Sequence, residues 1–238
     1  MDFEKFMNDS AGQYLPNLSI DMVIIGYENK QLKCLLLQIN NKWVLPGGYV
    51  SKTESVDDAA KRIMLERTGL NDAHLSFLTV MGGANRSFKA ELKSFFKTKN
   101  IPWKENLWIA DRFVSLTYYS LVHINNTKLK TGTMFEDLEW FDMNELPPMW
   151  LDHKEIVLKA KERLKKDVKQ EQFSYKLLPN KFTMPQLHGL HETIMQRSVD
   201  RSRFQKQMLA SGRFERLPQK PIKNTPGRNP YEYRAKTT

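Results

Sequence analysis

Apolar and polar positions follow two periods along the chain, and each period predicts one kind of secondary structure. Short runs rich in β-branched and aromatic residues predict strands, and the polar break YENKQ between the first two runs predicts a hairpin. These runs are SIDMVIIGY, LKCLLLQI, KWVLPGGYV, LSFLTVMGG, RFVSLTYYSLVHI and LEWFDM. In the third run, Pro46, Gly47 and Gly48 predict a turn where the backbone can approach a ligand closely.

Helical periodicity appears between and after these runs. From Ser55 the apolar positions recur at helical spacing, and Gly69 ends the pattern as a glycine at a helix C-terminus does. Residues 86–111 form a basic, aromatic stretch that predicts a short amphipathic helix and then a loop. The charged, periodic segment DHKEIVLKAKERLKKDVKQEQ predicts a long helix, and we place a domain boundary at its end, near residue 172.

Charge also divides the chain into two unlike parts. Residues 1–150 hold 17 Lys+Arg against 18 Asp+Glu, whereas residues 151–238 hold 20 against 9. A basic C-terminal part indicates an acidic partner, with nucleic acid first and a membrane surface second. A solvated basic tail that serves only solubility would explain the same numbers.

Composition excludes several classes of protein. Hydrophobic residues make up 40% of the chain, which is enough for a core. There is no run of about 18 apolar residues and no hydrophobic N-terminal signal segment, so we expect a cytoplasmic protein without a membrane partner. The single cysteine, Cys34, excludes a disulfide framework and a zinc–thiolate site.

Residues 47–70, GGYVSKTESVDDAAKRIMLERTGL, resemble the Nudix box, G-x5-E-x7-R-E-U-x-E-E-x-G-U, in which U is a bulky aliphatic residue. The matching positions are Gly48, Glu54, Arg62, Met64, Glu66, Gly69 and Leu70. The resemblance implies a Nudix fold, an α/β/α sandwich with a mixed sheet, within an α/β (α+β) protein.

The box departs from the family at two positions that bear on catalysis. Positions 63, 66 and 67 share one helix face, and in the Nudix enzymes glutamates there bind Mg²⁺ or Mn²⁺. Here they are Ile63, Glu66 and Arg67, so only Glu66 could bind a metal. We therefore expect no catalytic residue, no metal and no cofactor. The acidic residues of the run MFEDLEW could rebuild a metal site, although this run is more readily explained as a solvated strand. These residues are Glu136, Asp137 and Glu139.

The remaining box residues have a structural and a ligand-binding interpretation. Glu54 can pair with Arg62 and fix the loop on the helix. Arg67 could hold a phosphate directly, without a metal. We expect an effector to bind close to the glycine loop, where the candidate residues are Trp43, Gly47, Gly48, Tyr49 and Arg67.

The C-terminal part has the pattern of a winged helix-turn-helix. Thr183 is a good N-cap with Gln186 as the second half of a capping box, and Asp200 caps a second helix that ends near Gly212. The residues of this second helix that we expect to face inward are Phe204, Met208 and Leu209. Those that we expect to read base edges in a major groove are Arg201, Arg203, Gln205 and Lys206.

The segments RFERL and YEYRA predict two strands that flank a basic wing, QKPIKNTPGRNP. The cations that could each neutralise a phosphate are Arg213, Arg216, Lys220, Lys223 and Arg228. A winged helix that binds protein instead remains the alternative. His188 and His191 lack a carboxylate or thiol partner, so we expect no metal there.

Together, residues 1–172 and 173–238 resemble the Nudix-related transcriptional regulators of bacteria. The resemblance implies an effector-sensing, dimerising Nudix domain and winged helices that bind double-stranded operator DNA as a homodimer. One branch senses ADP-ribose or related nucleotides, and another is similar to arabinose regulators of Bacteroidetes that sense a pentose; the box substitutions look closer to the sugar branch.

Two other functions stay open: an active Mg-dependent hydrolase of a nucleoside diphosphate derivative such as ADP-ribose, and a non-catalytic nucleotide- or RNA-binding module. The insertion at 86–111 could cap the effector pocket, extend a dimer interface, contact DNA or have no role.

Overall fold

The computed structural model describes residues 12–71, 73–129, 137–171, 174–218 and 230–236, and its central element is a mixed sheet. Its strands are β1 (Tyr14–Glu28), β2 (Gln31–Ile39), β3 (Lys42–Val44), β4 (Gly47–Ser51), β5 (Leu75–Met81), β6 (Val114–Leu121) and β7 (Leu138–Asp142). The strand order is β3-β2-β1-β6-β5, with β4 also paired to β1 and β7 to β2. β1 and β6 run parallel, and the other neighbours are antiparallel.

Two helices cover the two faces of this sheet, α2 (Val56–Thr68) and α4 (His153–Glu171). Side chains of a strand alternate between faces, so β1 contributes to both cores. On one face, β1 packs Ile20, Met22 and Ile24 with α2; on the other, it packs Val23 and Ile25 with α4. The result is the predicted α/β/α sandwich.

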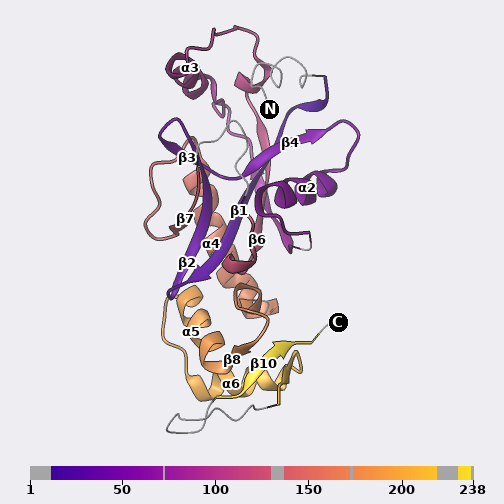
Figure 1. Cartoon of the computed structure of the whole chain (residues 1–238), viewed down its shortest axis with the longest axis vertical. Coiled ribbons are helices and arrows are strands. Elements are labelled where there is room, and N and C mark those ends of the chain that lie inside the picture. The colour runs from indigo at the N-terminus through magenta and orange to yellow at the C-terminus, as the bar shows by residue number, and fades with distance from the viewer. Residues whose placement is uncertain (1–11, 72, 130–136, 172–173, 219–229, 237–238) are drawn as a thin grey trace.

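The insertion forms a small unit of its own. It contains α3 (Lys89–Thr98) and the short helix η1 (Trp108–Ala110), which close over a core that includes Phe95, Phe96 and Leu107. This unit lies at the end of the molecule away from the C-terminal domain (Figure 1). The insertion and the domain for which the sequence predicts DNA contacts therefore lie at opposite ends of the molecule.

The C-terminal domain has helices α5 (Met184–Met195) and α6 (Arg201–Ala210) and a small sheet of order β8-β10-β9. The strands are β8 (Phe182–Thr183), β9 (Phe214–Arg216) and β10 (Glu232–Ala235), and short helices η2 (Ile124–Asn126) and η3 (Ser174–Leu177) complete the described elements. Its core is continuous with the core on the α4 face of the large sheet. The two halves therefore pack as one body.

The predicted strands and helices are confirmed, except that the turn at Gly47 and Gly48 is wrong. Both residues belong to β4, where Gly47 pairs with Asp21 and Gly48 with Ile20. A Cβ atom on Gly47 would lie 2.5 Å from the carbonyl oxygen of Ile20, so glycine here permits close packing of β4 on β1. In the described residues, no helix is long and apolar enough to span a bilayer.

Candidate effector site and nucleic-acid interface

The helix of the Nudix-like box begins and ends at the predicted residues. The Ser55 hydroxyl accepts a hydrogen bond from the Asp58 backbone N–H at 3.1 Å, which satisfies one free donor of the first turn. Gly69 closes the helix in the left-handed conformation, with φ of 73°. These caps place the box residues on a defined face of α2.

Arg62 joins the loop to this helix. Its guanidinium donates to both carboxylate oxygens of Glu54, at 3.0 and 2.8 Å, and to the carbonyl of Tyr49 at 2.9 Å. It also donates to Glu66 at 3.2 Å. The hydrogen bond from Arg62 is the main reason that the pKa of Glu54 is lowered, since it stabilises the charged carboxylate. The predicted pairing of Glu54 and Arg62 is confirmed.

The side chains at the two substituted box positions both contact β4. Ile63 is 1% exposed and lies under Gly48, so that a Cβ on Gly48 would come within 2.9 Å of the Ile63 side chain. Arg67 donates to the carbonyl of Gly47 at 3.3 Å. Burial lowers the pKa of Arg67, and the nearby Glu66 opposes that shift.

These residues do not fit the divalent metal of the Nudix enzymes. An alkyl side chain and a guanidinium occupy two ligand positions, and the third, Glu66, is paired with Arg62. Across the described residues, no group of three or more His, Cys, Asp or Glu side chains could hold a metal ion. Asp137 and Glu139 are exposed, and Glu136 lies outside the described residues.

The structure brings together most of the predicted effector residues. Gly47, Gly48 and Tyr49 follow one another on β4, and Arg67 reaches this strand from α2. Trp43 lies apart, on β3, where its ring packs edge-on against Phe141 at a centroid distance of 4.5 Å. β4 and α2 are therefore the elements that form the candidate site.

Sequence reasoning missed two contributions from the insertion. Trp108 packs edge-on against Tyr49, with ring centroids 4.6 Å apart, and lies beside Tyr14 and Phe113. Arg86 is 4% exposed and binds two aspartates that lie far apart in the chain. The single available signal was a cluster of aromatic residues in the insertion, because Tyr14 and Tyr49 are distant from Trp108 in sequence and both aspartates are distant from Arg86.

The helix-turn-helix has the predicted caps. Thr183 and Gln186 form a reciprocal capping box at the start of α5, and Asp200 accepts the backbone N–H of Arg203 at the start of α6. His188 and His191 both pack against Phe204, and a ring nitrogen of His188 bonds to the carbonyl of Val199. The other ring nitrogen of His188 lies 3.6 Å from the Glu192 carboxylate, so the prediction that His188 lacks a carboxylate partner is wrong. These histidines hold the two helices together.

One face of α6 is buried in the core and the other is exposed to solvent. Phe204 and Met208 are buried, whereas Leu209 is 44% exposed, so the prediction that Leu209 faces inward is wrong. Leu209 follows Met208 directly, and the 100° step between helix neighbours turns it off the buried face. The predicted base-reading residues are all exposed: Arg201, Arg203, Gln205 and Lys206.

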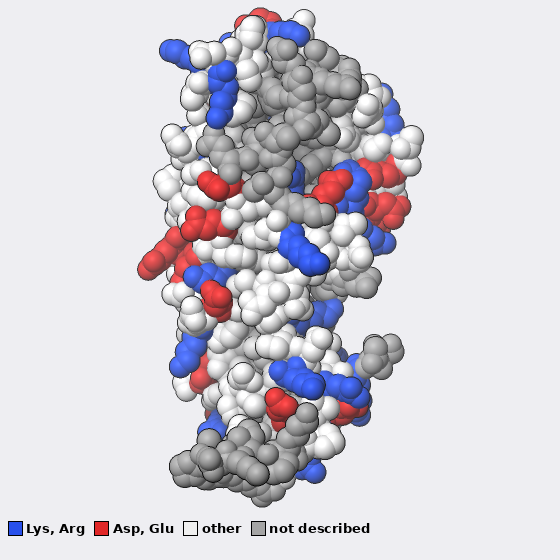
Figure 2. Space-filling model, in the orientation of Figure 1, with Lys and Arg blue, Asp and Glu red and all other residues white. Residues whose placement is uncertain are grey.

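The predicted wing is only partly within the described residues. Arg213 is exposed beside β9, and Arg216 on β9 stacks over the ring of Tyr231 at 4.5 Å. Lys220, Lys223 and Arg228 lie outside the described residues. On the face seen in Figure 2, most acidic side chains lie over the Nudix-like half, in agreement with the charge division of the sequence.

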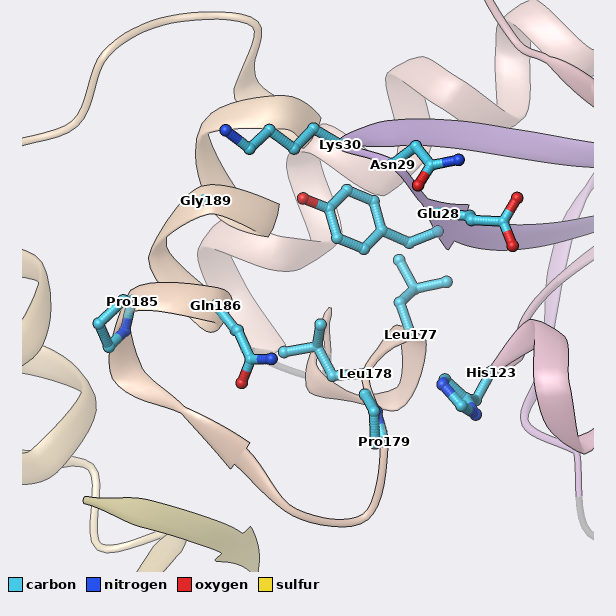
Figure 3. A pocket seen from close by; sticks show the side chains of 11 residues that line it. Glu28, Asn29, Lys30, His123, Leu177, Leu178, Pro179, Pro185, Gln186 and Gly189 are labelled. Carbon is cyan, nitrogen blue, oxygen red and sulfur yellow. The ribbon is translucent and has the colours of Figure 1, made fainter. Parts of the chain in front are cut away.

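A groove of about 410 Å³ lies between the two halves, away from the box. Figure 3 shows Glu28, Asn29 and Lys30 of the β1–β2 hairpin on one side and Pro185, Gln186 and Gly189 of α5 on the other. Leu177, Leu178 and Pro179 form its apolar floor. No residue predicted for a site lines it.

The fold and these sites define the class of protein: a Nudix domain joined to a DNA-binding winged helix domain, the arrangement of Nudix-related transcriptional regulators. The NUDIX domain model matches residues 17–160, and the model described as NrtR DNA-binding winged helix domain matches residues 174–235. The chain belongs to the NUDIX family.

Individual relatives are distant but similar over most of the chain. The chain is 24% identical over 216 residues to the ADPR responsive transcriptional repressor NtrR of Acinetobacter baylyi, covering 87% of this chain and 78% of that protein. It is 26% identical over 147 residues to an ADP-ribose pyrophosphatase of Methanocaldococcus jannaschii, covering 60% of this chain and 71% of that protein.

Solved structures agree with the fold. Shewanella oneidensis NrtR complexed with a 27mer DNA has a TM-score of 0.72 at 22% identity, covering 92% of this chain and 93% of that chain. A MutT/nudix family protein from Enterococcus faecalis has a TM-score of 0.67 at 22% identity, covering 99% and 94%. Both cover the two domains together.

Proposed function

We propose that the protein is a transcriptional repressor that binds operator DNA through its winged helix and responds to ADP-ribose or a related nucleoside diphosphate. The observation that carries the proposal is the solvent-exposed face of α6. Arg201, Arg203, Gln205 and Lys206 are exposed there, while Phe204 and Met208 of the same helix are buried in the core. The name of the Acinetobacter relative supports both the DNA and the effector.

The effector side rests on the chemistry around β4. Two box arginines, Arg62 and Arg67, donate to carbonyls of this strand, and the partly exposed ring of Tyr49 on the same strand packs against Trp108. Guanidinium groups suit a diphosphate and aromatic rings suit a base, so this set favours a nucleotide over a pentose. Both curated relatives are named for ADP-ribose.

We propose that binding occurs without hydrolysis, since positions 63 and 67 supply no metal ligand. The operator would be read by a homodimer whose two α6 helices enter half-sites about one helical turn apart, roughly 34–36 Å. Effector binding would then shift the population between two relative poses of the winged helices.

The test is fluorescence anisotropy of the full chain with the duplex upstream of its own gene, against a scrambled duplex. We expect selective binding that ADP-ribose shifts and that arabinose does not. Arg203→Ala should weaken operator binding by about 1–3 kcal/mol and reduce selectivity. Lys61→Ala, which removes an exposed charge from α2, is the control and should change little. Equal affinity for both duplexes would contradict DNA reading by α6.

A hydrolase is the rival function, favoured by the pyrophosphatase relative. It is tested by incubating ADP-ribose and Mg²⁺ with the protein and following release of AMP. We expect none. Turnover that Glu66→Gln abolishes would overturn the non-catalytic proposal and leave the DNA-binding proposal standing.

A further inference from the structure

Arg86 is a buried cation where four segments of the NUDIX domain meet. Its Nη2 donates to Asp21 of β1 at 2.6 Å, and its Nε donates to Asp152 at 3.0 and 3.2 Å. Its side chain is 3% exposed. Ser115 of β6 donates to the same Asp21 oxygen at 2.6 Å. The start of the insertion is thus tied to the sheet and to the residue that precedes α4.

His153, the first residue of α4, makes a second link. Its Nδ1 accepts the backbone N–H of Leu45 at 2.9 Å, just before β4. The ring is 2% exposed and lies edge-on to Phe88 at 5.9 Å. On β4 itself, a Cβ on Gly47 would lie 2.9 Å from an Asp21 oxygen. The strand of the proposed effector site therefore touches the aspartate, and the segment that leads into this strand touches the histidine.

This network is incomplete as it stands. Because Nδ1 of His153 accepts a hydrogen bond, the ring proton lies on Nε2. That Nε2 and the Nη1 of Arg86 are buried, and neither has a hydrogen-bond partner among the described residues. Next to them, Leu151 has φ of 46°, a conformation that is strained for leucine. Backbone strain clusters at the active sites and switch regions of proteins, and a buried donor without a partner calls for an explanation. Both features fit a region that can adopt a second conformation.

α4 leads from this network to the winged helix. Its buried face, with Ile156, Val157 and Leu164, belongs to the core that continues into α5 and α6. Lys165 of α4 also donates to Gln196 at the end of α5, at 2.8 Å. A displacement of the first turn of α4 would therefore be transmitted to the winged helix.

We propose that Arg86 is the positioning residue that couples the effector site to the winged helix. It holds the insertion, β1 and the start of α4 in one arrangement, and the effector at β4 shifts the balance to another. The inference rests on the proposed function and names the route of its regulation. Arg86 acts through Asp152 and Asp21 and is not assigned a contact with the effector or with DNA.

The experiment measures operator affinity of the full chain with and without saturating ADP-ribose, for wild type, Arg86→Lys and Asp152→Asn. Lysine keeps the charge but cannot bond both aspartates in the way the guanidinium does. We expect the effector-dependent change in Kd, which is typically about 5–150-fold for coupled sites, to fall close to 1 in both variants. Operator affinity without effector and affinity for ADP-ribose should each stay within about threefold of wild type.

Glu155→Gln is the matched control, because it breaks an exposed ion pair with Lys159 in the same turn of α4. It should keep the wild-type response. A full response in Asp152→Asn and Arg86→Lys would overturn the coupling role of Arg86. Wild type that binds operator without any response to ADP-ribose would instead overturn the proposed effector, so the two failures are distinguishable. A loss of basal operator affinity as large as the loss of response would indicate a merely structural role and would also overturn the inference.

Discussion

At the scale of single residues, Arg62 shows how a box of this kind can be retained for structure. Its guanidinium bonds to Glu54, Glu66 and the Tyr49 carbonyl, so it joins the loop, the helix and β4. Charge-assisted bonds of this geometry are stronger than neutral ones. The box therefore stabilises the fold whether or not it catalyses a reaction.

We expect Arg62→Met to lower the free energy of unfolding by about 1–2 kcal/mol, because Glu54 and the Tyr49 carbonyl both lose a donor. The side chain of Arg62 is 34% exposed, so water replaces part of what is lost. Urea unfolding of the purified chain measures the change. Lys61→Met is the control, since Lys61 is 68% exposed and pairs only loosely with Asp58. Equal stability of the two variants would show that the Arg62 bonds contribute nothing.

The same pair predicts a pH dependence. The pKa of Glu54 is lowered in the folded chain, chiefly by its hydrogen bond from Arg62, so the unfolded chain binds the proton more readily. The stability that ionised Glu54 contributes is thus present above its ordinary pKa of 4.5 and is lost as the pH falls through the lower folded value. Wild type should be more stable than Glu54→Gln at pH 7, and the difference should shrink below pH 4.5. Denaturant titrations across pH measure it, with exposed Glu145→Gln as a charge control.

At the scale of elements, replacing each of two helix glycines by alanine should change the stability of the chain in opposite directions. Gly189 lies inside α5, and a Cβ there would meet nothing within 4 Å, so Gly189→Ala should stabilise the chain by about 0.5–1 kcal/mol. Gly69 has φ of 73°, so Gly69→Ala should destabilise it by about 1–2 kcal/mol. Thermal unfolding compares the two. A destabilising Gly189→Ala would mean that α5 moves closer to the hairpin than the structure shows.

Elements were predictable where their signals are local. Ser55, Thr183 and Asp200 cap their helices with partners three residues away, so sequence alone placed these termini. β4 was missed because the same glycines suit a turn or a close strand, and only the neighbouring β1 decides between them. Arg86 could not be assigned at all, since its partners lie 65 and 66 residues away.

At the scale of the whole molecule, one apolar core joins the two domains. It runs from Val23 and Ile25 of the sheet through Leu164 of α4 to Leu190 and Phe204 of the winged helix. A shared core makes independent unfolding costly, because either domain alone would expose apolar surface to water. The same continuity is what would carry an effector signal to α6.

The last prediction follows from this shared core. Tryptophan fluorescence reports only the NUDIX half, because all five tryptophans lie at or before residue 150. They are Trp43, Trp103, Trp108, Trp140 and Trp150. Leu190→Ala, in the buried face of α5, should cost about 2–5 kcal/mol. If the chain unfolds as one body, the fluorescence transition and the helical circular dichroism transition fall together to a lower temperature.

Leu209→Ala is the control for this substitution, because Leu209 is 44% exposed and its truncation should leave both transitions in place. A tryptophan transition that stays unchanged while the circular dichroism becomes biphasic would show that the domains unfold separately. A separable winged helix would also weaken α4 as a rigid connection, and the coupling would then have to pass through a dimer interface. Coincident transitions leave α4 and the continuous core as the shortest physical route between β4, the strand of the proposed effector site, and α6, the helix proposed to read DNA.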